Sequence, residues 1–445
     1  MKIRLKLWYF NNKNIINTTK FLFISVIMLI TVWFMDVRYP QLTAAMPKFM
    51  LLSIDVSKSF LATLSGVFLT VATFTFTTIL TVLTTYNSSF TPRVVQKFIN
   101  KPHVLSLIGI FIGGFFYTVL SLFILQDIQS GQRILAGSLG VGYAIASMVY
   151  FMLFVQQVIR DIKSANLIED IFEEASALVE KEAEKRKNSQ RLAKDKIGKT
   201  IPLYANQTGY FYEINTEHLL QLTKEIACEI VIHKKIGQYV SKGIYLADLN
   251  MIEKNISEKS VEDEDAFLEE IANCFILNRT KNDSRDYHQE IINLVEIALR
   301  AISPGINDPN TAINCVDRIA NLLGQLFSTK NKFIVLKDST DAKIIYITYS
   351  VEEELYLSFY QLIFYGKKDP SVAYAILEGL YLIYMLADDS AKESVQVFFE
   401  QTYEVTFHSM NTEMDKNHLQ SIRQDFLENK DKQCITKKKD DGPEK

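Results

Sequence analysis

Five threonines repeat along one apolar stretch of the chain at a spacing that suits the passage of ions or water. Their separations of 3, 4, 4 and 3 residues place five hydroxyls on one face of a helix. Such a stripe can replace part of an ion's hydration without carrying charge, as a membrane conduit requires. Helix packing is the competing interpretation, because hydroxyl residues are common where membrane helices associate and a threonine can bond its own preceding carbonyl. The pore-lining candidates are Thr70, Thr73, Thr77, Thr81 and Thr84.

A second group of residues could bind an anion at a turn between two predicted helices. Residues 303–309 read Ser-Pro-Gly-Ile-Asn-Asp-Pro, in which Pro304 lacks an amide donor and Gly305 tolerates positive φ, so the first helix should end here. Asp308 is predicted to cap the next helix, with Pro309 in its first turn. The amides at that helix start could hold an anion or phosphate, although capping alone explains most of these residue types. The candidates at this turn are Arg300, Ser303, Gly305, Asn307, Asp308 and Thr311.

A glycine cluster in another apolar stretch indicates close packing of membrane helices. Gly109 is followed by Gly113 at a spacing of four residues, and Gly114 comes directly after it. Glycines at this spacing let two helix backbones approach closely, so all three are expected in helix packing.

No catalytic or metal-binding template is found in the sequence. It contains no phosphate-binding glycine loop, no HExxH and no GxSxG, and its four cysteines form no CxxC pair. Asp286 and His288 beside Arg285 form the only local polar cluster, which we interpret as surface rather than as a metal site because zinc needs three or four ligands. We therefore expect a protein that is not an enzyme and that holds no metal and no cofactor.

Four long apolar stretches are expected to position these residues. The stretches are Phe21–Met35, Leu61–Tyr86, Val104–Leu125 and Ile134–Ile159. Each contains no ionised side chain, and about 20 apolar residues suffice to span a bilayer. The first stretch also resembles a signal peptide, but its apolar run ends about ten residues before the small residues around Ala44, so we expect it to stay uncleaved.

Charge is divided unevenly along the chain and predicts the topology. Residues 1–160 hold 13 Lys+Arg and three acids, a net of +10; subtraction from the totals of 48 and 51 leaves 35 and 48 for residues 161–445, a net of −13. Of the Lys and Arg residues that flank the four stretches, 10 lie on the side of the N-terminus and 4 on the other. Both termini should therefore be cytoplasmic in a bacterial plasma membrane. The acidic second half argues against a nucleic-acid binder, which needs basic surface.

The predicted fold is an integral membrane protein with a four-helix transmembrane region, followed by a cytoplasmic α+β region. Period-2 patterning predicts strands near 209–214 and 230–233, in a small β module similar to a barrel-sandwich domain. Longer helical patterns follow, including 261–278, and a hairpin over 332–348 interrupts them. The predicted divisions are an N-terminal cytoplasmic segment (1–20), the transmembrane domain (21–160), a helical linker (161–199), the β module (200–255), a mainly helical domain with the hairpin (256–430) and a disordered tail (431–445).

Two segments resemble a family of bacterial membrane proteins, domain of unknown function 2254. These are IALRAISPGINDPNTAINCVDRI over 297–319 and YNSSFTPRVV over 86–95, where Thr91 replaces the serine typical of that family. The similarity extends from about Phe21 to about Leu386. It implies an integral membrane protein with a cytoplasmic domain and supplies no activity.

The sequence favours a homo-oligomeric, channel-like or conduit-forming protein whose cytoplasmic domain acts as a gate or sensor. The expected partners are the lipid bilayer, further copies of the chain and a small anionic ligand in the cytoplasmic domain, with no nucleic acid. The alternative is a membrane-anchored ligand sensor or assembly scaffold whose helices only tether it.

Overall fold

The computed structural model forms two compact units, Met1–Asn166 (the membrane unit) and Leu167–Lys445 (the second unit). The structure describes the following residues: 13–89, 102–126, 128–129, 131–161, 164–189, 197–224, 228–252, 264–279, 286–329, 333–337 and 343–440.

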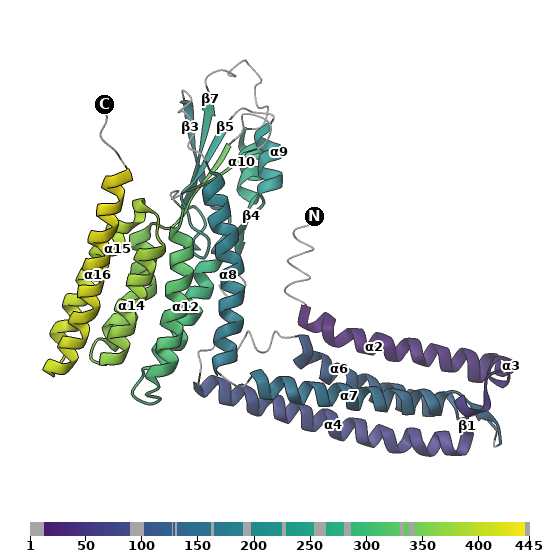
Figure 1. Ribbon diagram of the computed structural model, residues 1–445. Coiled ribbons are helices and arrows are strands. Elements are labelled where there is room, and N and C mark those ends of the chain that lie inside the picture. Colours follow the sequence, from purple (N-terminus) through teal and green to yellow (C-terminus); the bar gives the residue numbers. More distant parts are fainter. Residues whose placement is uncertain are drawn as a thin grey trace. The chain divides into compact units, whose positions relative to one another are not determined.

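The membrane unit contains four helices that are long and apolar enough to cross a bilayer. They lie side by side in Figure 1 as α2 (Lys13–Val32), α4 (Ile54–Ser89), α6 (Pro102–Ile124) and α7 (Ala136–Asp161). Half of the α6 span is buried, against about a fifth of each other span, and α6 packs on α2, α4 and α7. The third predicted span is therefore the central helix of the unit.

The three glycines predicted to mediate packing all lie on α6 against neighbouring helices. A Cβ on Gly109 would come within 2.6 Å of the backbone oxygen of Thr18 on α2. At Gly113 it would meet the Ser25 hydroxyl at 2.7 Å, and at Gly114 the ring of Tyr143 on α7 at 2.8 Å. Real Cβ contacts are not this short, so each helix approaches α6 only because a side chain is missing there.

A buried carboxylate joins the end of the first span to the start of the fourth. Asp36 lies in η1 (Trp33–Arg38), a π-helical segment that continues α2, and its side chain is 3% exposed. Its oxygens accept from the backbone amides of Leu135 (2.9 and 3.0 Å) and Ala136 (2.9 Å), and from the Thr43 hydroxyl (3.2 Å). The carboxylate thus satisfies amides at the start of α7 that have no partner within the helix.

Short elements complete this end of the membrane unit. Helix α3 (Pro40–Ala44) contacts both η1 and β2 (Arg133–Ile134). The 3₁₀ turn η2 (Lys48–Met50) leads into β1 (Leu52–Ser53), which pairs antiparallel with β2.

Two sheets form the β part of the second unit. The first has the order β3-β7-β5-β10-β9 and the second the order β6-β4-β8. Strand β10 is parallel to β5 and antiparallel to β9, and the remaining neighbours are antiparallel. The strands are β3 (Ile197–Tyr204), β4 (Gly209–Ile214), β5 (Cys228–Ile232), β6 (Tyr239–Val240), β7 (Tyr245–Ile252), β8 (Phe275–Asn278), β9 (Phe333–Lys337) and β10 (Lys343–Ile347).

Helices form the rest of the second unit, with α12, α14, α15 and α16 side by side in Figure 1. Helix α11 packs on α12 and α13, and 11 of its 15 residues are buried. The helices are α8 (Ser164–Asn188), α9 (Thr216–Lys224), α10 (Glu264–Asn273), α11 (Tyr287–Ala301), α12 (Pro309–Phe327), α13 (Val351–Gly366), α14 (Pro370–Leu386), α15 (Asp389–Ser409) and α16 (Glu413–Asp440).

The structure differs from three of the predicted elements. The helix expected over 261–278 is the shorter α10 followed by strand β8, because Phe275 and its neighbours pair with β4 in a sheet that local periodicity does not reveal. The predicted hairpin exists, but β10 pairs with β5, so β3, β5 and β7 share one sheet with the hairpin, whereas β4 and β6 lie in the second sheet with β8. The tail expected to be disordered from 431 continues as α16 to Asp440, and residues 441–445 lie outside the described part.

Candidate functional site

The threonine stripe lies on the outer surface of the membrane unit. All five side chains are exposed on α4, whereas residues on another face of that helix, among them Leu61, Phe68 and Ile79, are buried against the bundle. Each hydroxyl donates to the carbonyl four residues earlier, at 2.9 Å (Thr70), 3.0 Å (Thr73, Thr77 and Thr81) and 2.7 Å (Thr84). The single donor of each hydroxyl is engaged, so the stripe presents acceptor lone pairs outward.

Small residues extend the same face toward the start of α4. Ser59 and Thr63 are exposed, and the Thr63 hydroxyl donates to the Ser59 carbonyl at 2.9 Å. A Cβ on Gly66 would meet nothing within 4 Å, so this position is a shallow notch in the surface. From Ser59 to Thr84 the face rises roughly 38 Å along the helix, enough to cross the hydrocarbon core.

The Ser-Pro-Gly-Ile-Asn-Asp-Pro turn joins α11 to α12 and is exposed from Pro304 to Asn307. The left-handed residue is Asn307, with φ +52, and not Gly305 as predicted, because asparagine also tolerates this conformation. The Ser303 hydroxyl donates to the Arg300 carbonyl at 2.6 Å and brings these two candidates together. The turn is then closed by backbone bonds from Asn307 to Ser303 and from Asp308 to Ala301, each 2.9 Å.

Asp308 caps α12 as the sequence predicts. Its carboxylate accepts from the Thr311 amide at 3.1 Å and from the Thr311 hydroxyl at 2.6 Å. A negative group therefore already occupies the place that an anion would take at this helix start. The geometry favours the structural interpretation of the turn.

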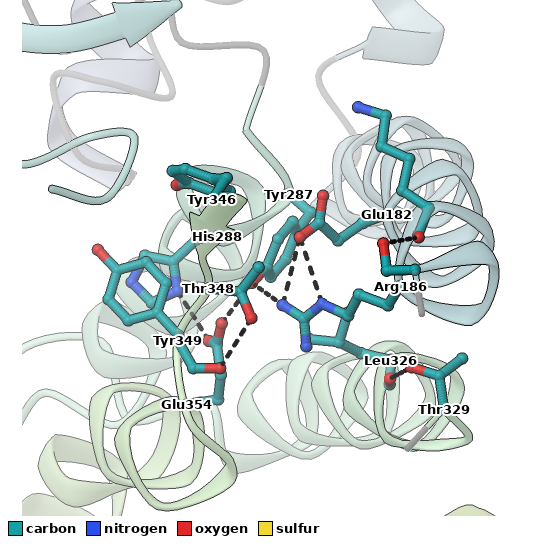
Figure 2. A network of polar contacts seen from close by, with 12 residues as sticks. Glu182, Arg186, Tyr287, His288, Leu326, Thr329, Tyr346, Thr348, Tyr349 and Glu354 are labelled. Atoms are coloured by element: carbon teal, nitrogen blue, oxygen red, sulfur yellow. Dashed lines mark hydrogen bonds and ion pairs between the residues drawn. The ribbon is translucent and has the colours of Figure 1, made fainter. Parts of the chain in front are cut away.

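A buried polar network in the second unit joins three helices (Figure 2). Glu354 of α13 is fully buried and accepts from the Tyr287 hydroxyl at 2.6 Å; its second oxygen lies 2.9 Å from Nδ1 of His288. Arg186 of α8, 4% exposed, donates to the Tyr287 hydroxyl at 3.0 Å and to Glu182 at 3.3 Å. Charges and hydroxyls from α8, α11 and α13 thus satisfy one another away from water.

Two aromatic rings and a lysine border this network. The rings of Tyr349 and His288 stack at 4.5 Å, and the Lys235 ammonium lies 4.4 Å from the centre of the Tyr349 ring. Lys235 also donates to Glu353 at 2.5 Å. These contacts connect the β5–β6 loop to the start of α13.

Burial shifts the proton affinities of the network. Desolvation raises the pKa of Asp286 to about 7, while His288 opposes the shift and Glu354 and Glu182 add to it. Burial also raises the pKa of Tyr287 well above its ordinary value, and Glu354 reinforces this shift. For Arg186 burial disfavours the cation, but Tyr287, Glu182 and Glu354 outweigh it and raise the pKa. The phenol and the guanidinium therefore keep their protons at neutral pH.

The surface interpretation of Asp286 and His288 was wrong. Both are more than nine-tenths buried, and Asp286 caps α11 by accepting from the His288 amide at 3.2 Å. The partner of His288, Glu354, lies 66 residues away in the sequence, and Arg186 lies 101 residues from its partner Tyr287, so local pattern could not reveal the network. Arg285 lies outside the described residues, and the described ones form no group of three metal ligands.

Comparison with known proteins shows the family of the chain. A model of predicted membrane proteins, DUF2254, matches residues 17–381. An uncharacterized protein of Mycobacterium bovis is 22% identical over 321 residues, as is one of Mycobacterium tuberculosis, strain H37Rv. Each alignment covers 70% of this chain and 60% of the relative, so the chain spans less than two thirds of these proteins. No solved structure matches. The resemblance stated from the sequence is confirmed, and the chain belongs to the DUF2254 family of predicted membrane proteins.

Proposed function

We propose that the chain forms a homo-oligomeric conduit in the bacterial plasma membrane, with the threonine faces of several copies around the axis. The observation that supports this proposal is the exposed hydroxyl stripe on α4, which no helix of the same protomer covers in the described part. The hydrocarbon core offers no hydrogen-bond donor to the outward lone pairs of the stripe, whereas water along the axis of a conduit would donate to them.

The chemistry of the stripe favours cations and water over anions as the passing species. Because each hydroxyl donates to its own backbone, the oxygen faces outward as an acceptor, which suits a cation or a water hydrogen. The net charge of −13 on residues 161–445 would attract cations to the side of the membrane on which this part of the chain lies. The second unit, which we place in the cytoplasm from the Lys and Arg distribution, acts as gate or sensor.

Cation flux through liposomes that contain the full chain tests the proposal. We expect potassium flux that falls severalfold in Thr73→Val and Thr77→Val, since valine keeps the shape and removes the oxygen. Thr78→Val is the matched control, because Thr78 also bonds the carbonyl four residues earlier but projects about 100° away from the stripe. Wild-type protein without flux, or equal loss in Thr78→Val, would overturn the conduit.

A sensor or scaffold that the four helices only tether is the second candidate. A cavity of about 520 Å³ in the second unit supports it. The cavity lies between α8 and the α12–α14 pair and is lined by Ser176, Glu180, Ala183, Gly324, Gln325, Ser328 and Leu386. This function predicts that changes in the second unit, Asp308→Ala among them, abolish its activity while Thr73→Val is silent.

A further inference from the structure

An apolar groove lies where α2 passes into η1 and the chain turns back through α3. Its volume is about 460 Å³, and it is lined by Ile30, Thr31, Phe34, Met35 and Leu42. The hydroxyl of Thr31, the one polar side chain among them, donates to the Ile27 carbonyl at 2.9 Å. The groove therefore offers no free donor to a polar ligand.

The surroundings of the groove decide what fills it. Four of the five lining residues belong to the first membrane-spanning helix, Thr18–Arg38, so the groove opens toward lipid. Water in the groove would have too few polar partners, and an empty groove would lose dispersion contacts. A lipid acyl chain needs no polar partner and supplies the dispersion contacts.

The Arg38 cation is connected to the groove through two aromatic rings. The Phe34 ring, which lines the groove, lies 4.7 Å from the Tyr39 ring, and the Arg38 guanidinium lies 5.5 Å from the centre of the Tyr39 ring. Arg38 is exposed and forms no ion pair with the residues that the structure describes. The adjacent carboxylate, Asp36, is instead engaged by the amides of Leu135 and Ala136. The guanidinium donors of Arg38 are thus left for a phosphate.

Further positive charge lies at this end of the unit. Arg133 of β2 donates to the Lys48 carbonyl at 3.4 Å, and α3, which directly follows Arg38 and Tyr39, contacts β2. Arg38, Lys48 and Arg133 outnumber Asp55, the exposed carboxylate at the start of α4, so the net positive charge favours a headgroup with net negative charge over a zwitterionic one.

We propose that this groove binds an anionic phospholipid, with one acyl chain against Phe34 and Leu42 and the phosphate on Arg38. The bound lipid holds the corner between η1 and α3 in place. The site belongs to a single protomer and is independent of any conduit.

Tryptophan quenching in the full chain tests this site. With Trp8→Phe as background, Trp33, 48% exposed and next to Phe34, is the sole tryptophan. The probe is delipidated protein in detergent, titrated with phosphatidylglycerol carrying brominated acyl chains, and with phosphatidylcholine carrying the same chains. We expect saturable quenching that phosphatidylglycerol reaches at lower concentration.

Two variants probe the two ends of the site. Arg38→Gln should raise the half-quenching concentration of phosphatidylglycerol about tenfold through the loss of a charge-assisted bond. Leu42→Phe should fill the groove and reduce the quenching by both lipids. Arg160→Gln, an exposed arginine at the other end of α7, should change neither.

Several outcomes would overturn the lipid site. Unsaturable quenching, equal affinity for both lipids, or the same loss in Arg160→Gln and Arg38→Gln would each do so. A Trp33 that is shielded from both lipids by a second copy of the chain would assign the groove to self-association instead.

Discussion

Glu354 has a demanding environment, because its carboxylate has no exposure and depends on two partners for its hydrogen bonds. Tyr287 donates to one oxygen and His288 lies against the other. Removing one partner of such a group leaves the others buried without compensation. The residues that hold α8, α11 and α13 together are therefore also the ones least tolerant of substitution.

We predict that Glu354→Ala destabilises the second unit by about 3 kcal/mol, as expected when one partner of a buried charged network is removed. The measurement is thermal unfolding of the full chain in detergent, followed with a thiol-reactive dye in a Cys434→Ser background. Cys228, Cys274 and Cys315 are buried, and burial raises the pKa of each thiol to about 12, so the dye reports unfolding. Glu352→Ala, two residues away and exposed, should cost less than about 1 kcal/mol. Equal losses in both variants would contradict the prediction.

The raised pKa of Asp286 sets the direction in which the stability of the second unit changes with pH. Its pKa rises from 3.8 in the unfolded chain to about 7 in the folded one, so between these values the folded state binds more protons. Stability therefore falls as the pH rises from about 4 to about 7, by up to about 4 kcal/mol.

Asp286→Asn should flatten this dependence while keeping the helix cap, since asparagine caps equally well. The thiol-dye assay between pH 5 and pH 8 should show the variant gaining stability relative to wild type as the pH rises. Asp388→Asn, the same change at the cap of α15, should leave the slope unchanged. A slope in Asp286→Asn equal to that of wild type would show that another group carries the dependence.

Helix α6 is the central helix of the membrane unit, and its glycines, which have no side chain, let the other helices pack closely against it. Gly109 allows α2 to approach until its backbone is in contact, and the equivalent approach at Gly114 admits the Tyr143 ring of α7. Sequence spacing predicted glycines for packing, but the partner of each glycine depends on which helices are neighbours.

We expect Gly109→Ala to disrupt the α2–α6 contact, because its Cβ would come within 2.6 Å of the Thr18 backbone oxygen, which cannot rotate away. The cost should be about 1–3 kcal/mol, as for other overpacked sites. Gly142→Ala on α7 is the control, since a Cβ there meets nothing within 4 Å. The measurement is the free energy of unfolding of the two variants, from denaturant titration in mixed micelles followed by Trp33 fluorescence. An unaffected Gly109→Ala would mean that α2 does not pack on α6 in this way.

The local sequence pattern predicted individual helices and strands better than it predicted which of them contact one another. The four apolar helices follow from the length of their apolar runs, and the start of α12 follows from its capping residue Asp308. Other features arise only when distant segments come together in the folded chain. They include the pairing of β8 with β4 and the contact of Arg186 with Tyr287, 101 residues away. The buried network was missed for this reason, since each helix contributes only one or two of its members.

The two units differ in charge and in the kind of surface they expose. The membrane unit exposes apolar side chains broken by one hydroxyl face, whereas the acidic second unit buries its polar network. The proposed transport depends on the hydroxyl face, and therefore on contact between that face and water.

Labelling of single cysteines in α4 measures this directly. The variants are Thr73→Cys, Thr77→Cys and Phe76→Cys, each in the Cys434→Ser background. All three positions are exposed and lie at similar depth along α4, but Phe76 projects about 100° from the stripe. In liposomes, a membrane-impermeant cationic thiosulfonate should modify the two stripe cysteines and leave Phe76→Cys unmodified in the lipid. Stripe cysteines that resist the reagent as fully as Phe76→Cys would contradict the conduit.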